Sequence, residues 1–84
     1  MASGVGIYLS YDPESDILEL VKNPDQPYVS REIRRGLFVH VEPKSRAIVG
    51  FAVHHFSRGF GSDPLNLPLR ATFEPAEEIE RVET

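Results

Sequence analysis

Two neighbouring apolar segments constrain the fold of this chain more than any other feature. Leu37–Glu42 and Ala47–Phe56 are rich in β-branched and aromatic residues, and a polar turn that begins with proline, residues 43–46, separates them. This arrangement is typical of a β-hairpin. In an antiparallel sheet with one solvated face, apolar and polar residues alternate, but in this hairpin both alternating sets are apolar. Both faces of the predicted hairpin must therefore be covered.

The length of the turn sets the register of the predicted hairpin. With residues 43–46 as the loop, Phe38 lies opposite Phe51 and His40 lies opposite Val49. A shift of one residue would exchange the two faces. The predicted faces are Phe38, His40, Val49, Phe51 and Val53 on one side, and Leu37, Val39, Val41, Ile48, Gly50 and Ala52 on the other.

The size of the chain bears on how these faces are covered. Its 84 residues make one domain, and a domain this small buries only about 60% of the surface that its unfolded chain exposes. Few residues remain outside the sheet to form two covering layers. We therefore expect a second copy of the chain to supply one layer, as a homodimer, because two-fold symmetry is the commonest arrangement.

The first part of the chain predicts three further strands. Residues 5–11 and 16–22 flank the sequence Asp-Pro-Glu-Ser at 12–15, in which aspartate and proline both favour a tight turn. Residues 28–34 follow a break that contains two prolines, and their polar alternation suits an edge strand. The predicted fold class is therefore mainly β, a small antiparallel sheet of five or six strands.

The last third of the sequence predicts less regular structure. Residues 57–66 contain two glycines and a proline and are expected to form a loop. Residues 65–73 alternate apolar and other residues around Pro68, which predicts an edge strand or an extended arm. Residues 75–84 are acidic and form either a short helix or a tail. We divide the chain into one β domain, 1–74, and this C-terminal segment.

Charge and composition exclude several classes of protein. The chain has 13 acidic and 9 basic residues, and five of the acids and one base lie in its last eleven residues, so the remainder is neutral. A nucleic-acid partner is not expected, because it requires a basic surface. No apolar stretch approaches the roughly 18 residues that a membrane helix needs, and there is no cysteine for a disulfide or a thiolate metal site. Without an export signal at its N-terminus, the chain is expected in the cytoplasm.

Three histidines are the first candidates for chemistry. His54 and His55 are adjacent, so on a strand they point to opposite faces and cannot bind the same ion. His40 and His55 share a face in the predicted register, but about 20 Å of strand separates them. A zinc site needs three or four ligands about 2 Å from one point, so histidines satisfied by nearby hydrogen bonds are favoured over a metal site, whose existence stays open, and no cofactor is expected. All three histidines stay candidates for binding a small molecule.

A basic and aromatic patch is predicted on the edge strand. Arg31, Arg34 and Arg35 lie close in sequence to Tyr28. Such a patch can contact RNA, but charged side chains on an edge strand also prevent pairing with other sheets. We favour the second role and keep the three arginines as candidate binding residues.

The sequence around the first turn resembles a known family. The run Tyr11 to Leu20, Tyr-Asp-Pro-Glu-Ser-Asp-Ile-Leu-Glu-Leu, and the later Ile-Val-Gly-Phe at 48–51 are similar to two blocks of the YuzE-like family of small prokaryotic proteins. Tyr11, Asp12 and Asp16 are the turn residues that carry the resemblance. It implies a small β-rich fold with no assigned activity. It also implies an antitoxin-like role, because some members are thought to be encoded beside toxin-like partners.

Two functions follow from these features. The first is a non-enzymatic binding or regulatory module that works as a homodimer and engages a protein partner. The second is a small-molecule or metal-binding protein, with weak hydrolytic chemistry, centred on the histidines of the central hairpin. A pocket that joins a histidine and a carboxylate favours the second function. The first predicts no pocket, and a free edge or tail that orders on binding.

Overall fold

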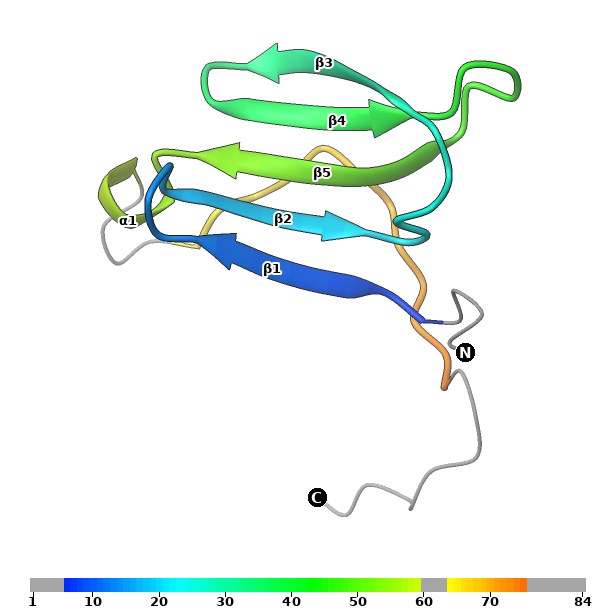
Figure 1. Ribbon diagram of the computed structural model, residues 1–84, viewed down its shortest axis with the longest axis horizontal. Coiled ribbons are helices and arrows are strands. Elements are labelled where there is room, and N and C mark those ends of the chain that lie inside the picture. Colours follow the sequence, from blue (N-terminus) through cyan, green and yellow to red (C-terminus); the bar gives the residue numbers. More distant parts are fainter. Residues whose placement is uncertain (1–5, 60–63, 76–84) are drawn as a thin grey trace.

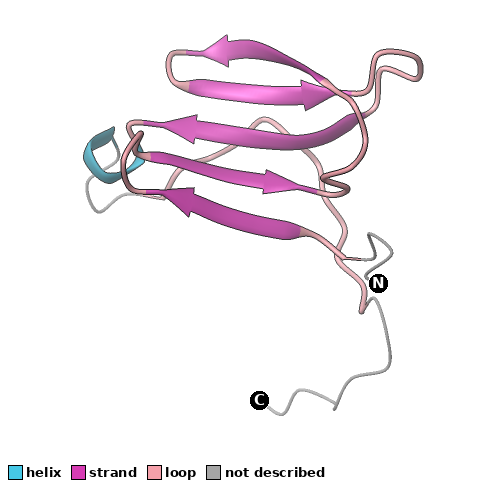
Figure 2. Cartoon of the chain, in the orientation of Figure 1, coloured by secondary structure: helices cyan, strands magenta, loops and turns pink. Residues whose placement is uncertain are grey.

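The protein folds as one open antiparallel sheet of five strands. The computed structural model describes residues 6–59 and 64–75, and Figure 1 shows the order of the strands across the sheet, β1-β2-β5-β4-β3. The mainly β class expected from the sequence is confirmed, and loops account for most of the rest (Figure 2). The elements are β1 (Tyr8–Asp12), β2 (Ile17–Val21), β3 (Val29–Arg34), β4 (Leu37–Val41), β5 (Ile48–His54) and α1 (Phe56–Gly59).

The segment expected to be an edge strand lies at an edge. β3 pairs only with β4, and β1, at the opposite edge, pairs only with β2. The two central apolar segments form β4 and β5, and β2 covers the other side of β5. The sheet therefore places its most apolar strands in the centre, where both edges of each strand are hydrogen-bonded.

The register of the central hairpin differs from the predicted one. Phe38 lies opposite Ala52, and His40 lies opposite Gly50, because β5 carries one extra residue, Val49, at a bulge between the pairs His40/Gly50 and Val41/Ile48. A bulge of this kind places two residues of one strand opposite one residue of its partner. The predicted faces of β5 are therefore exchanged relative to β4.

The observed register gives the two faces of the sheet different chemistry. Directly opposed residues share a face, so Leu37, Val39, Phe51 and Val53 lie together on what we call the back face. The same pairing extends the back face to Leu18 and Leu20 of β2 and to Leu9 and Tyr11 of β1. What we call the front face carries these residues of β4 and β5: Phe38, His40, Gly50, Ala52 and His54.

An extended arm from the same chain covers part of the back face. Residues 64–75 contain no regular strand, and they cross behind the sheet in Figure 1. The arm is tied to the sheet where Arg34 Nη1 of β3 donates a hydrogen bond to the carbonyl oxygen of Asn66, over 3.2 Å. Of the two alternatives predicted for residues 65–73, the structure shows the extended arm.

Two further predictions concern the end of the last strand and the C-terminal segment. Residue 56 was predicted to end a strand and residues 57–66 to form a loop, but β5 ends at His54 and a single helical turn, α1, follows. The strand ends because His55 adopts a positive φ of 56°, which turns the chain away from the sheet. The expected helix or tail at 75–84 lies outside the described residues, apart from Pro75. Within the described ranges, no helix is long and apolar enough to cross a membrane.

Candidate functional site

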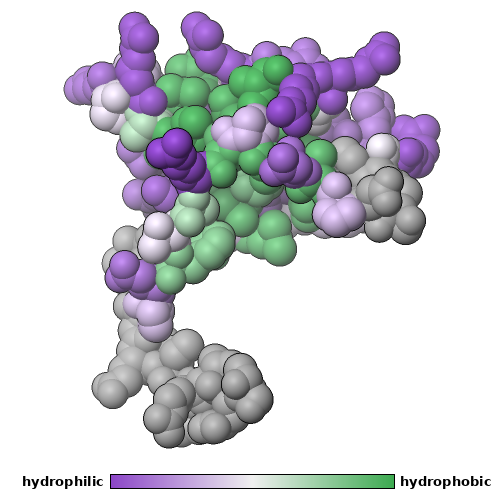
Figure 3. Space-filling view, turned by 180° about the vertical axis from the view of Figure 1, so that it is seen from behind, coloured by the Kyte–Doolittle hydropathy of each residue, from purple (hydrophilic) through white to green (hydrophobic). Residues whose placement is uncertain are grey.

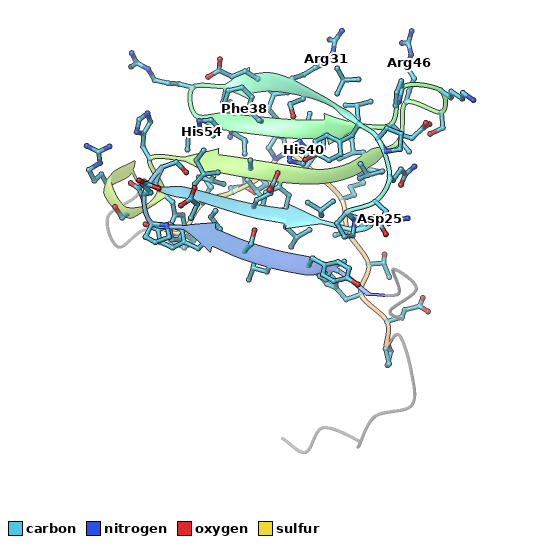
Figure 4. The ribbon with its side chains drawn as sticks, in the orientation of Figure 1. Asp25, Arg31, Phe38, His40, Arg46 and His54 are labelled. Carbon is cyan, nitrogen blue, oxygen red and sulfur yellow. The ribbon has the colours of Figure 1, made fainter. Side chains whose placement is uncertain are left out.

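The front face contains a shallow hollow of about 410 Å³ that opens to solvent. Figure 4 shows Phe38, His40 and His54 along β4 and β5 in this part of the sheet. Residues from all five strands and from the segment before β3 line it, and we call it the front hollow. Its lining residues are Ser10, Asp12, Ser15, Ile17, Glu19, Tyr28, Ser30, Phe38, His40, Ala52 and His54.

His40 is the central residue of the front hollow and is only 3% exposed. Its Nε2 lies 2.7 Å from Glu19 Oε2, and its Nδ1 lies 2.8 Å from Ser30 Oγ. An ionised carboxylate only accepts hydrogen bonds, so Nε2–H donates to Glu19. In the neutral ring, Nδ1 then accepts the hydroxyl hydrogen of Ser30. Both ring nitrogens are thus satisfied, as a buried polar group requires.

Tyr28 covers the imidazole ring of His40. The two rings are stacked with their centroids 4.2 Å apart and their planes 28° from parallel. The Tyr28 hydroxyl donates a longer hydrogen bond, 3.4 Å, to Glu19 Oε2. Burial raises the pKa of the Tyr28 hydroxyl, and the adjacent Glu19 charge adds to the rise. Glu19 Oε2 therefore accepts from two rings at once, which fixes the position of its carboxylate.

Gly50 makes room for the imidazole ring. A Cβ built on Gly50 would lie 3.1 Å from His40 Cδ2 and would collide with the carbonyl oxygen of Leu20 on β2. β2 and β5 therefore approach each other closely at this position, and only a residue without a side chain permits it.

A second stacked pair of rings adjoins the first. Phe38 and His54 have centroids 4.3 Å apart and planes 29° from parallel. The front hollow is therefore walled by four aromatic or imidazole rings, from Tyr28, Phe38, His40 and His54.

The charged strand residues that the structure describes on the front face are all acidic. The pairings place three carboxylates there, those of Asp12, Glu19 and Glu32. Among the strand residues that the structure describes on this face, none is lysine or arginine. By contrast, Arg31 and Arg34 lie opposite Val39 and Leu37, on the back face.

The order Ser30–His40–Glu19 matches the order of a serine–histidine–acid relay. The backbone around Ser30 differs from that around the nucleophile of a hydrolase. Ser30 lies on an extended strand, whose backbone N–H groups point within the plane of the sheet rather than into the front hollow. An acyl-transfer site needs donors aimed at the developing oxyanion next to the nucleophile. The contacts of the network hold the Glu19 carboxylate and the His40 ring in place.

The structure places two of the three candidate histidines on one face, and they are not the two that were predicted to share a face. His40 shares the front face with His54, not with His55, because the extra residue in the Val49 bulge shifts β5 by one position. His55 lies in the exposed turn after β5, where its Nδ1 is 3.2 Å from Arg58 Nη2.

The three candidate arginines do not join the histidines. Arg31 borders a separate depression of about 390 Å³, together with Arg46, and both side chains lie at the β3 side of the sheet in Figure 4. Arg34 binds the arm, and Arg35 is exposed in the turn between β3 and β4.

The turn residues Tyr11, Asp12 and Asp16 have local structural partners. Asp12 Oδ1 accepts a hydrogen bond from the backbone N–H of Glu14, over 3.1 Å, and Oδ2 accepts from Ser15 Oγ, over 2.8 Å. These bonds, first that from Ser15, lower the pKa of the Asp12 carboxyl. Asp12 therefore holds the tight turn between β1 and β2.

Asp16 links that turn to α1. Its carboxylate accepts hydrogen bonds from the Tyr11 hydroxyl at 2.6 Å, the Ser57 backbone N–H at 3.0 Å and Ser57 Oγ at 2.9 Å. The Tyr11 bond contributes most to lowering the pKa of Asp16, and the same bond raises the pKa of Tyr11. Arg58 Nε adds a longer ion pair at 3.6 Å. We call Tyr11, Asp16 and Ser57 the turn clasp.

Glu19, Ser30 and Phe38 were not predicted as site residues from the sequence. Glu19 had one signal, since it is the single charged residue inside the apolar β2 sequence Ile-Leu-Glu-Leu-Val. Ser30 and Phe38 had none, because their contact with the histidines depends on the register. Over residues 6–59 and 64–75, no group of three or more histidine, aspartate or glutamate side chains is placed to hold a metal ion.

Comparisons with known proteins add no relative. No family model, no curated protein and no solved structure matches this chain. The similarity to the YuzE-like family therefore stays a prediction from the sequence.

Proposed function

We propose that this protein is a non-enzymatic binding module whose ligand site is the front hollow. The observation that carries the proposal is the network around His40, in which a buried imidazole joins Glu19, Ser30 and Tyr28 at the floor of an open hollow. Binding sites combine apolar or aromatic walls with a few fixed polar groups, and the front hollow has both. Of the two functions predicted from the sequence, a pocket that joins a histidine and a carboxylate favours the small-molecule-binding one, without its metal or hydrolytic chemistry.

The orientation of the network supports binding over catalysis. Ser30 has the hydrogen-bond partner of a nucleophile, but its strand offers the hollow no pair of backbone donors for an oxyanion. A fluorophosphonate probe labels activated serines, and we expect it to leave Ser30 unmodified. Labelling that is lost in Ser30→Ala would replace the binding proposal with a hydrolytic one.

A chemical-shift experiment tests the site itself. A uniformly ¹⁵N-labelled sample is titrated with a fragment set that holds equal numbers of cationic, neutral and anionic compounds. We expect the amides that shift to cluster at Glu19, Tyr28, His40 and Ala52. Absence of shifts in this cluster across the whole set, or shifts only at the back face, would contradict the proposal.

We also propose that the protein works as a homodimer that pairs through the back face. The arm leaves both margins of this face uncovered, since Leu9 of β1 is 65% exposed and Val29 of β3 is 52% exposed. Figure 3, which views the molecule from behind, shows apolar residues at the surface on this side. Exposed apolar residues gathered on one face are typical of an interface, and a two-fold partner is the simplest occupant.

Adjacent residues on opposite faces test the dimer. Leu9 lies on the back face and Ser10 on the front face of the same edge strand. By native mass spectrometry we expect a dimer for the wild type and for Ser10→Lys, and a monomer for Leu9→Lys. A monomeric wild type would overturn the proposal, and so would a dimer that survives Leu9→Lys. The antitoxin-like role and the cytoplasmic location stay predictions from the sequence.

A further inference from the structure

We infer that the ligand of the front hollow carries a guanidinium group. The inference rests on the proposed binding function and names the class of ligand that the hollow takes. It combines three features of the site: the sign of its charge, the flat rings that wall it, and a carboxylate held in a fixed position.

The charge of the hollow favours a cation. Glu19 is one-third exposed at its side chain, and His40 and Tyr28 both bind its Oε2. Within the described residues, no hydrogen bond is made to its Oε1. Asp12 lines the same hollow, and the described strand residues of this face include no lysine or arginine that would neutralise the carboxylates. An anionic ligand would be repelled by these carboxylates, whereas a cation gains a partner.

The rings of the hollow favour a planar cation over a compact one. Tyr28 and Phe38 each present an aromatic ring to the hollow, and aromatic faces attract cations. A guanidinium group can lie flat on such a ring while its edge N–H groups point to a carboxylate. An ammonium group is a compact, strongly hydrated charge, which gains the attraction to the carboxylate but not the stacking.

His40 acts as a positioning residue in this arrangement. Its Nε2–H fixes Glu19 Oε2, and its ring supports Tyr28 from the side opposite to solvent. Ser30 in turn fixes the orientation of the imidazole through Nδ1. The carboxylate is thereby held in position with its Oε1 directed to the N–H groups of a partner, which lowers the entropy lost on binding.

The guanidinium group has two chemical sources, an arginine side chain of a partner protein and a free guanidino compound. Both place the same cation against Glu19. A short blocked peptide, acetyl-Gly-Arg-Gly-amide, represents the first source, and methylguanidinium chloride represents the second. The matching peptide with citrulline in place of arginine keeps the shape and removes the charge.

The test is a set of ¹⁵N chemical-shift titrations at constant ionic strength. We expect methylguanidinium to shift the amides around Glu19 and His40, to bind several-fold more tightly than methylammonium, and to bind about tenfold more tightly than neutral methylurea. Tighter binding of the arginine peptide than of methylguanidinium, with loss in the citrulline peptide, identifies a partner's arginine as the source. Equal or weaker peptide binding identifies a free guanidino compound.

Matched variants separate recognition from folding. Glu19→Gln keeps an acceptor for His40 and removes one charge, so we expect guanidinium affinity to fall about tenfold while the fold is retained. Glu74→Gln removes one charge from the exposed arm and should leave the affinity unchanged. Tyr28→Leu should weaken binding, and Tyr28→Phe should restore most of it, because the phenyl ring keeps the stacking surface.

The outcomes distinguish this inference from the function on which it rests. If neutral or anionic fragments shift the front-hollow amides and guanidinium does not, the guanidinium inference is wrong and the binding function stands. The inference is also wrong if Glu19→Gln binds methylguanidinium as well as the wild type. If no compound of any charge shifts these amides, both proposals fail.

Discussion

The two faces of the sheet bury their central residues to the same extent by different means. Val39 on the back face is 4% exposed and His40, its neighbour on the front face, is 3% exposed. Val39 lies opposite Phe51 of β5, on the face that the arm crosses. On the front face, no strand or helix among the described residues covers His40, which is buried by Tyr28 and by its hydrogen bonds to Glu19 and Ser30.

The difference shows how a small sheet can keep one face open. Apolar burial has no preferred direction and requires a covering layer. Hydrogen-bonded burial needs only a few partners in fixed positions, but every partner is then required. The front face therefore achieves burial without a layer and keeps a hollow, and it should tolerate substitution less well than the back face does.

Gly50 is the position where this comparison predicts the largest effect. Gly50→Ala places a methyl group against the Leu20 carbonyl oxygen and against the His40 ring. We expect it to destabilise the fold by about 3 kcal/mol or more, because backbone must move to accept it. The measurement is urea unfolding followed by circular dichroism.

Gly59 supplies the control for that variant. A Cβ on Gly59 meets no atom within 4 Å, so Gly59→Ala should change the stability by less than about 0.5 kcal/mol. Equal stability losses for the two variants would mean that the close approach of β2 and β5 is not what requires glycine.

Truncation on the back face should have the next largest effect. Val39→Ala removes two methyl groups from a buried site and should cost about 2 kcal/mol, from lost apolar burial and the cavity left behind. Val29→Ala makes the same change at the exposed margin of this face, where we expect less than about 0.5 kcal/mol in the monomer. Denaturation at low protein concentration measures both, and similar losses would mean that the burial of Val39 does not set its contribution to stability.

Replacement of the imidazole should have an effect of comparable size but of different origin. His40→Leu is apolar and of similar size, yet it leaves Glu19 and Ser30 without a partner, at a cost of about 1–3 kcal/mol. Val39→Ile, an apolar change at the adjacent back-face site, should cost less than about 1.5 kcal/mol. The same unfolding experiment compares them. If His40→Leu is the more stable of the two, hydrogen bonds are not what holds the front face together.

Much of the fold was predictable from the sequence, but the register and the site were not. The strands, the edge position of residues 28–34 and the turn at 43–46 follow from local patterns, and the turn does join Glu42 N–H to the Ala47 carbonyl at 2.8 Å. Both faces of the hairpin are apolar in sequence, so periodicity could not reveal the bulge at Val49. The bulge decides that His54, and not His55, joins His40.

The network around His40 could not be predicted from local sequence patterns for a related reason. Glu19 lies 21 residues from His40 in the sequence. Their strands, β2 and β4, lie on either side of β5 in the sheet, and the two side chains meet across β5. Tyr28 reaches His40 from the segment before β3, which is irregular in structure. Contacts across a sheet depend on strand order, which hydrophobic periodicity does not encode.

The turn clasp is a second hydrogen-bonded network, and unlike the network around His40 it is exposed to water. Hydrogen bonds from Tyr11 first, and then from Ser57, lower the pKa of the Asp16 carboxyl in the folded state below its unfolded value of about 3.8. A lowered pKa means that the stabilisation is complete above the unfolded value and is lost as the pH falls through the folded one. We therefore expect the free energy of unfolding to decrease below about pH 4, and this decrease to be shallower in Asp16→Asn.

Tyr11→Phe isolates the bond that contributes most to this effect. It removes the hydroxyl that donates to Asp16 Oδ1 and keeps the ring that packs edge-on against Phe56, with centroids 6.0 Å apart. Unfolding measured from pH 2 to 6 should show the acid-dependent loss reduced in this variant, though less than in Asp16→Asn, because Ser57 still donates two hydrogen bonds. An acid dependence identical to that of the wild type would mean that the clasp, unlike the buried network of His40, works without its tyrosine. The stability of this end of the sheet would then rest on Ser57, Arg58 and the turn backbone.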